Sequence, residues 1–250
     1  MGIYGVLFGD KHTYKDWRLI PKSRPVVSPP EVKTLYVDIP GADGAMDLTQ
    51  ALTDDVKYRN RKISFEFFVL EARKRWSTIY SEIMGYLHGQ SMQIILDEDP
   101  DYYYTGRIQV NAWKSDKKTS TITIEADVEP YKLSRISTTE PWLWDTFNFE
   151  TGIITNYNAM PFDSVATPGQ RFYCIVTGRK WIVPEFTVTS SGGADITLGV
   201  STPKGWKSIV CPSGVSTKNY NVVWSAGRWI VQLNTQASGT ITINYRTGRL

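Results

Sequence analysis

A strand pattern that decides the fold of the first part of the chain occupies residues 61–70, RKISFEFFVL. Apolar residues fall at every second position, which is the period of a strand with one buried face: Ile63, Phe65, Phe67 and Val69. The same alternation returns in residues 120–130, STITIEADVEP, and predicts a second strand of this kind. The first part of the chain therefore contains a sheet with one apolar face.

The segment between these strands, residues 71–90, has a different period. Its apolar residues are three or four positions apart, the spacing of an amphipathic helix: Trp76, Ile79, Tyr80, Ile83, Met84 and Leu87. The pattern predicts a helix over about 71–88, with Gly89 as its C-terminal stop. Such a helix covers a sheet face.

The second part of the chain differs in composition. Residues 1–140 hold 39 charged side chains (19 basic, 20 acidic), whereas residues 141–250 hold 14 (9 basic, 5 acidic). Short alternating runs such as VPEFTVTS (183–190) and GTITINY (239–245) are separated by turn residues, which indicates an antiparallel β-sandwich. We therefore predict a mainly β protein with an α+β first domain, residues 1–135, and an all-β second domain, residues 136–250.

Composition also limits the partners. The net charge of +3 over 250 residues favours neither a nucleic acid nor a membrane surface. We recognise no signal peptide and no apolar run of about 20 residues, the length that crosses a bilayer, so we expect synthesis in the cytoplasm and no membrane partner. Cys174 and Cys211 form no disulfide framework, and we expect both to be buried and reduced.

An acidic cluster in LDEDPDYYYTGRI (96–108) resembles a metal loop at first sight. Asp97, Asp99 and Asp101 have the spacing that opens a helical-hand calcium loop, which then needs Gly at its sixth position and Glu at its twelfth. Tyr102 and Ile108 stand at those positions. The sequence favours a solvated hairpin turn instead.

Catalytic motifs are absent from the sequence. The two histidines, His12 and His88, have no metal-ligand spacing, and there is no nucleophile elbow, phosphate loop or dinucleotide fingerprint. A carboxylate pair of the glycosidase kind could form only in three dimensions. We expect no catalytic site, no metal and no cofactor, and therefore no enzyme.

Tryptophans of the second part leave two interpretations open. Trp206, Trp224 and Trp229 could stack on sugar rings, which would make the protein a carbohydrate-binding module that recognises cell-wall glycans. A sandwich of this size also needs large side chains for its core and edges. The core interpretation is favoured.

The loop sequence YVDIPGADGAMDLTQAL, residues 36–52, separates two strand-like runs. Pro40 ends a strand, Gly41 and Gly44 permit positive φ, and Asp43 and Asp47 can bond to nearby amides. The loop lacks the Glu of a calcium site and the Lys or Ser/Thr of a phosphate site. It is therefore a shaped turn.

Several stretches together resemble the distal tail proteins of long-tailed (siphovirus-type) bacteriophages. The resemblance rests on WRLI (17–20), PPEVKTLYVDIPGADGAMDLTQALTDDVKYRNRKISFEF (29–67), DPDYYYTGRI (99–108), EADVEPYK (125–132), WDTFNFETG (144–152) and GTITINYRTGRL (239–250). It spans essentially the whole chain.

This resemblance implies a structural role in the virion. Distal tail proteins form a ring, usually a hexamer, at the end of the tail tube, alone or as stacked rings. Their N-terminal domain is a β-sandwich or split barrel with one helix, similar to tail-tube proteins, and their C-terminal domain is a galectin-like sandwich. The ring is the hub that joins the tube to the tail tip or baseplate and carries receptor-binding devices. The implied partners are other copies of the chain, the tail-tube protein and tail-tip proteins.

A ring requires surfaces that dock onto identical copies. The runs 58–70 and 102–110 are near the upper end of strand length, so their edges could pair with a neighbour. We predict that the loop between the strand-like runs lies at a subunit interface, with these candidate residues: Asp38, Pro40, Gly41, Asp43, Gly44 and Asp47.

Overall fold

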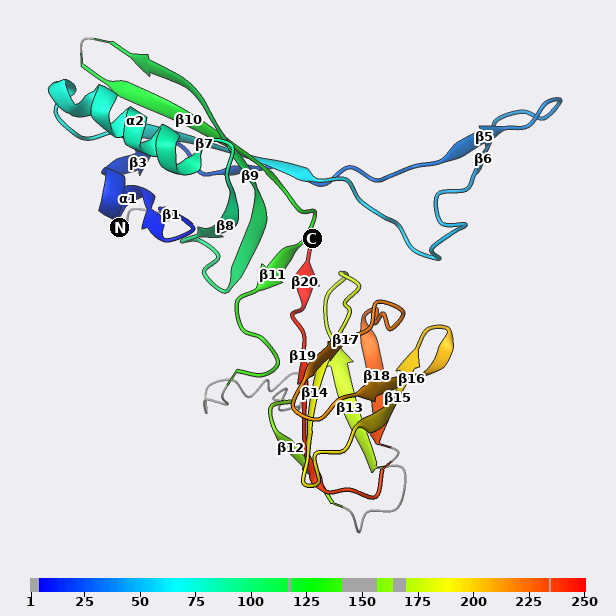
Figure 1. The fold of residues 1–250 in the computed structure, drawn as a ribbon. Helices are drawn as coiled ribbons and strands as arrows, with labels where there is room; N and C mark the ends of the chain where they lie inside the picture. The colour runs from blue at the N-terminus through cyan, green and yellow to red at the C-terminus, as the bar shows by residue number, and fades with distance from the viewer. Residues whose placement is uncertain (1–4, 117, 141–156, 164–169, 234) are drawn as a thin grey trace. The chain divides into compact units, whose positions relative to one another are not determined.

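The chain forms two compact units in the computed structural model (Figure 1). The first comprises Met1–Lys132 with Leu250, and the second comprises Leu133–Arg249. The structure describes residues 5–116, 118–140, 157–163, 170–233 and 235–250. The stretch WDTFNFETG lies outside the described residues.

An antiparallel sheet with the strand order β2-β1-β8-β9-β10-β7-β3 forms the first unit. Its strands are β1 (Val6–Phe8), β2 (Lys11–His12), β3 (Leu19–Pro21), β7 (Arg61–Val69), β8 (Ser91–Leu96), β9 (Tyr102–Ser115) and β10 (Ser120–Val128), and β4 (Val26–Val27) also pairs with β7. The strands predicted at 61–70 and 120–130 are β7 and β10, and they are direct neighbours. Their apolar positions face one core: Ile63, Phe65, Phe67, Ile122, Ile124, Ala126 and Val128.

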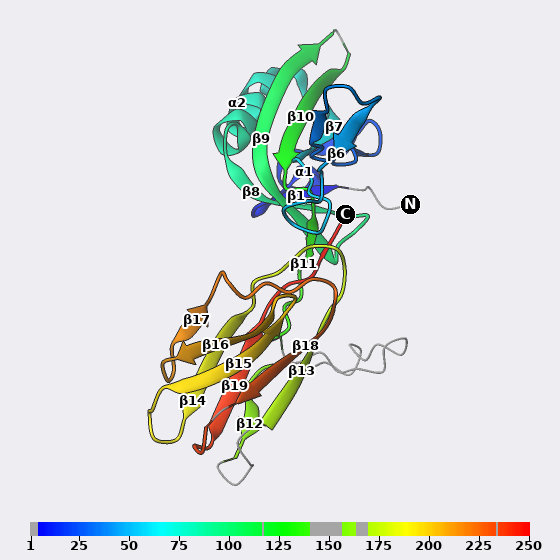
Figure 2. The same cartoon turned by 90° about the vertical axis from the view of Figure 1, so that its right-hand side faces the viewer.

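The predicted helix is present as the 3-10 turn η1 (Arg73–Arg75) followed by α2 (Trp76–Leu87). It lies in front of the sheet in Figure 1 and to its left in Figure 2, so it covers one sheet face. Ile79, Ile83 and Leu87 belong to the buried core of the unit, as their spacing predicts. The helix ends before Gly89, which has a φ of 76°. A one-turn helix, α1 (Thr13–Trp17), has no counterpart in the sequence prediction.

Two four-stranded sheets form the second unit, with the orders β12-β19-β14-β17 and β13-β18-β15-β16. Their strands are β12 (Met160–Phe162), β13 (Gln170–Val176), β14 (Glu185–Ser190), β15 (Ile196–Thr202), β16 (Gly205–Cys211), β17 (Ser216–Lys218), β18 (Gly227–Leu233) and β19 (Gly239–Asn244). Side chains from both sheets form one core, among them Phe186, Leu198, Val231 and Ile243. The predicted antiparallel sandwich and the mainly β fold are thereby confirmed. The short strands β11 (Lys132–Ser134) and β20 (Gly248–Arg249) pair with each other.

The sandwich core also contains the two cysteines. Cys174 and Cys211 are free thiols and both are buried, as predicted. Burial raises the pKa of Cys174 to about 12. Beside it, burial raises the pKa of Tyr245, whose hydroxyl donates to Ile175 O at 2.6 Å.

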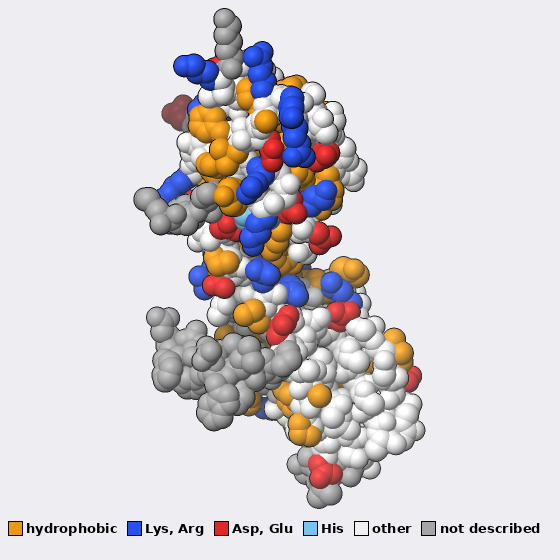
Figure 3. Space-filling view, turned by 90° about the vertical axis from the view of Figure 1, so that its left-hand side faces the viewer, with side chains coloured by type: hydrophobic (Ala, Val, Ile, Leu, Met, Phe, Trp, Pro, Cys, Tyr) orange, Lys and Arg blue, Asp and Glu red, His pale blue; other side chains and the backbone are white. Residues whose placement is uncertain are grey.

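Charge is distributed unevenly between the units. On the face in Figure 3, Lys, Arg, Asp and Glu side chains are spread over the first unit, whereas the described surface of the second unit shows few of them. In the part of the chain that the structure describes, no helix has the length and apolarity needed to cross a membrane.

Candidate functional site

A β-hairpin, hereafter the arm (residues 31–59), projects from the sheet of the first unit, and its residues 31–47 are exposed. Its outer strands are β5 (Tyr36–Asp38) and β6 (Ala45–Asp47), which form a separate two-stranded sheet (Figure 1). Two backbone bonds of 2.8 Å continue the ladder toward the body of the unit, from Leu48 N to Leu35 O and from Lys33 N to Lys57 O. The loop that the sequence singles out is therefore the outer half of this arm.

The turn of the arm has the geometry that its glycines predict. Gly41 and Gly44 have φ values of 86° and 78°. Ala42 N donates to Ile39 O at 3.1 Å and closes the turn. A side chain at either glycine would meet no atom within 4 Å, so the backbone conformation, and not space, requires glycine here.

The predicted aspartate bonds form at one position. Asp47 Oδ1 accepts from Thr49 N at 2.9 Å, and hydrogen bonds from the Thr49 side chain and backbone lower the pKa of the Asp47 carboxyl. Asp43 makes no hydrogen bond to any residue that the structure describes, because it lies at the open end of the turn.

Side chains on the two faces of the arm differ in polarity. Val37 lies opposite Met46, and Tyr36 lies opposite Asp47. Because side chains alternate between faces, one face of the arm is apolar and the other mostly polar. The apolar face carries Leu35, Val37, Ile39, Met46 and Leu48; the opposite face carries Thr34, Tyr36, Asp38, Asp47 and Thr49.

The apolar face is largely exposed in the structure. Every residue from 31 to 47 is exposed, and Leu35, Val37, Ile39 and Met46 retain 42–50% of their accessible surface. An isolated two-stranded hairpin is only marginally stable in water, and clustered apolar side chains on a surface mark interaction sites. The arm therefore has the character of a docking element. The sequence analysis missed this apolar face, although the alternation in LYVDI and AMDL indicates it.

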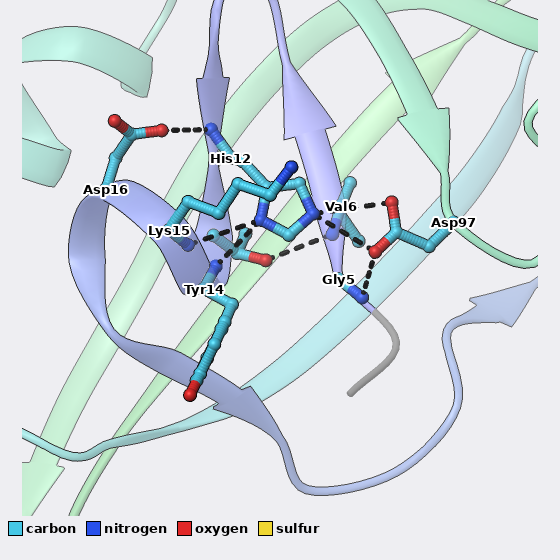
Figure 4. Close-up of polar contacts among 8 residues, drawn as sticks. Gly5, Val6, His12, Tyr14, Lys15, Asp16 and Asp97 are labelled. Atoms are coloured by element: carbon cyan, nitrogen blue, oxygen red, sulfur yellow. Dashed lines mark hydrogen bonds and ion pairs between the residues drawn. The ribbon is translucent and has the colours of Figure 1, made fainter. Parts of the chain in front are cut away.

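A histidine–carboxylate pair links β2 to the residue after β8 (Figure 4). His12 Nε2 lies 3.0 Å from Asp97 Oδ2, which also accepts from Gly5 N at 2.7 Å. His12 Nδ1 accepts from Tyr14 N at 3.2 Å and from Lys15 N at 3.3 Å, and so caps α1. Because Nδ1 is an acceptor, the proton is on Nε2 and is donated to Asp97. The imidazole stabilises the helix and has no basic nitrogen left for a substrate.

The remaining candidates for metal or acid–base chemistry also form hydrogen bonds or ion pairs within the fold. His88 Nδ1 accepts from Val110 N at 3.2 Å. Asp99 forms an ion pair with Lys132, and Tyr102 N donates to Asp99 O at 3.2 Å, so the acidic cluster is a hairpin turn. Across the described ranges, no group of three or more His, Cys, Asp or Glu side chains could hold a metal ion.

The three tryptophans named as glycan contacts lie in different environments. Trp224 is 0% exposed, its Nε1 donates to Ser201 O at 2.8 Å, and its ring stacks on Trp229 at 6.3 Å. It is a core residue and offers no ring to a ligand. Trp206 is 53% exposed on the edge strand β16, whereas Trp229 is half-buried on β18, with β15 between these strands. A glycan contact at Trp206 or Trp229 stays a prediction.

Fold and arm together define a class: a mainly β protein whose first unit is a helix-covered antiparallel sheet with a projecting hairpin, and whose second unit is a β-sandwich. No family model and no curated protein matches the chain. Among solved structures, the chain is similar to the Dit protein (gp 19.1) of phage SPP1, with 10% sequence identity and a TM-score of 0.62 over 98% of this chain and 99% of that one. SPP1 Dit is described as a paradigm of the hub adsorption apparatus in phages that infect Gram-positive bacteria.

This comparison extends over both units. The predicted resemblance to distal tail proteins is confirmed at the level of the fold, since a protein of that family shares the architecture over nearly its full length. At 10% identity the likeness establishes the fold alone.

Proposed function

We propose that the protein is a structural component of a phage tail and that its copies assemble into a ring, most simply a hexamer, at the distal end of the tail tube. The ring would act as the hub between the tube and the tail tip or baseplate, and would carry the devices that contact the host. Support for this role comes from the shared fold with SPP1 Dit. The proposed location is the virion, and the proposed role is non-enzymatic.

The observation that carries the proposal is the arm with its uncovered apolar face. Leu35, Val37, Ile39 and Met46 lie on one side of a hairpin that the rest of its own chain leaves exposed. A second copy of the chain would cover this face and supply the packing that an isolated ribbon lacks.

A contact between the arm and another copy permits ring closure. A contact between the arm of one copy and the body of another is heterologous, because two different surfaces meet. Heterologous contacts close into rings when the rotation between copies fits, and otherwise continue into filaments. The candidate interface residues Asp38, Pro40, Gly41, Asp43, Gly44 and Asp47 shape the outer half of the arm and would set the angle at which it meets its neighbour.

The same proposal assigns a role to each domain. The first domain, residues 1–135, would build the ring and contact the tail-tube protein. The second, residues 136–250, would face outward and present its sandwich to tail-tip or receptor-binding proteins.

Solution mass tests the proposal. The full chain would be examined by sedimentation velocity and native mass spectrometry from about 1 to 100 µM, a range that detects association free energies of roughly −8 to −5 kcal/mol. Negative-stain images of the assembled fraction would show annuli of one diameter. A chain that stays monomeric over the whole range, or that forms open filaments, would contradict a self-closing ring.

A further inference from the structure

A pocket of about 380 Å³ lies in the second unit and belongs to none of the features described so far. Its volume is within the range of small-molecule sites, roughly 300–1,000 Å³. It is built on the outer face of the sheet β19-β14-β17 and beside the segment that precedes β14. The lining side chains that matter for ligand chemistry are Trp181, Glu185, Lys218, Tyr220, Asn244 and Arg246.

The floor of the pocket is a row of polar side chains across three strands. Glu185 of β14 pairs with Lys218 of β17 on one side and with Asn244 of β19 on the other. Its neighbour Phe186 is fully buried, so Glu185 faces away from the core. Three polar groups of different character therefore stand side by side on an open sheet face.

The carboxylate at the centre of this row is held in place. Glu185 Oε1 accepts from Ser216 Oγ at 2.5 Å, and Oε2 accepts from Asn244 Nδ2 at 3.3 Å. A carboxylate offers about four acceptor positions, of which these bonds use two. The remaining positions can accept from ligand hydroxyl groups without any change in the side chain.

Aromatic side chains border the same pocket. Tyr220 is 76% exposed, and Lys218 Nζ lies 5.9 Å from the centre of its ring. Trp181 also lines the cavity. A ring this exposed contributes little to the core, whereas aromatic faces beside fixed polar groups suit a ligand that has one apolar face and a polar rim. A sugar ring has that character, because its C–H groups form a face and its hydroxyls a rim.

The charge of the site is positive. Lys180, Lys218 and Arg246 line the pocket with Glu185, and Glu140 lies 4.0 Å from Arg246 Nη2. More cationic than anionic side chains therefore line the pocket. This lining favours a ligand with an anionic group over a neutral one.

We propose that this pocket binds a short saccharide that carries a carboxylate or phosphate group. Tyr220 and Trp181 stack on the sugar ring, Glu185 and Asn244 bond to its hydroxyls, and the lysines face the anionic group. The site differs from the predicted tryptophan contacts, since Trp206 lies on β16 in the other sheet. It does not depend on ring assembly, so it can be tested apart from the proposed function.

Calorimetric titration of the full chain tests the site. The probes are digalacturonic acid for the carboxylate arm, N-acetylglucosamine 6-phosphate for the phosphate arm, neutral chitobiose, and inorganic phosphate. We expect saturable binding of at least one acidic sugar with a Kd of about 1 mM or tighter, and weaker binding of chitobiose and inorganic phosphate. Which acidic sugar binds identifies the anionic group.

Two variants locate the binding. Tyr220→Ala should weaken the affinity about tenfold, and Glu185→Gln should weaken it severalfold, while Tyr173→Ala, the removal of an exposed aromatic ring in the other sheet, should leave it unchanged. Tyr220 is too exposed to affect folding, and an unchanged unfolding midpoint of each variant verifies this.

The proposal is overturned if no probe saturates at about 10 mM, a limit of roughly −2.7 kcal/mol. It is also overturned if inorganic phosphate competes as well as the sugar phosphate, since the pocket is then a simple anion site. A loss of binding in Tyr173→Ala but not in Tyr220→Ala would move the site to the other sheet.

Discussion

Polar substitutions on the apolar face of the arm that keep the shape of the arm should weaken the self-association of the chain. The triple variant Val37→Thr, Ile39→Thr and Met46→Gln keeps β-branched or straight side chains of similar volume. Each of these side chains still exposes 42–50% of its surface in the isolated chain. Full burial of such a side chain contributes about 1.5–3 kcal/mol, so burial of the exposed half contributes about 0.7–1.5 kcal/mol. Three together amount to about 2–4 kcal/mol per interface, or roughly 30- to 700-fold in Kd.

Sedimentation velocity over a concentration series measures this effect. The variant should require correspondingly higher concentrations to reach the mass of the native assembly, with unchanged circular dichroism. Tyr36→Thr is the matched control, because it removes a large exposed side chain from the opposite face of the same strand. If the triple variant assembles like the native chain, or if Tyr36→Thr is equally damaging, the apolar face is not the docking surface and the reasoning is refuted.

Three further predictions concern the stability of the two units. Trp224→Ala should destabilise the second unit by about 3–5 kcal/mol, because it empties a fully buried site and leaves Ser201 O without its donor, whereas Trp206→Ala should change the free energy of unfolding by less than about 1 kcal/mol in urea titrations. Cys174 has a pKa raised by burial to about 12 from 9.0, so the unfolded thiol ionises first as the pH rises. The free energy of unfolding should therefore fall between pH 9 and 12 by about 1.4 kcal/mol per pH unit from this group alone. A Cys174→Ala variant with an unchanged slope against pH would contradict the assignment. Gly106→Ala should prevent regular pairing of β9 with β10, because the added Cβ would lie 2.2 Å from Asp127 O. Wild-type hydrogen-exchange protection along β10 in that variant would contradict this prediction, because it would show that β9 and β10 can accommodate the added Cβ without loss of stability.

The spacing of apolar residues predicted the elements in which one face contacts the core along the whole length of the element. The period of two in β7 and β10 and the period of three to four in α2 each arise because one face contacts the core and the other contacts water or a neighbour. The turn at Gly41 and Gly44 was predictable for a similar reason, since positive φ is a property of the residue itself. The short α1 was missed because its cap depends on His12, a residue type without a strong capping signal in sequence.

Contacts between distant segments were beyond the sequence. Nothing near Asp97 indicates that its carboxylate binds His12, and nothing near Trp224 distinguishes it from the exposed Trp206. The amino-acid order by itself determined the strand and helix periods, the special turn of the arm and the contrast in charge between the two parts. Only the tertiary structure decided which tryptophan is core, that the apolar face of the arm stays largely exposed, and that Glu185 shares its sheet face with Lys218 and Asn244. The physical reason is that periodicity arises from neighbours along the chain, whereas burial and strand pairing depend on segments that meet only after the chain has folded.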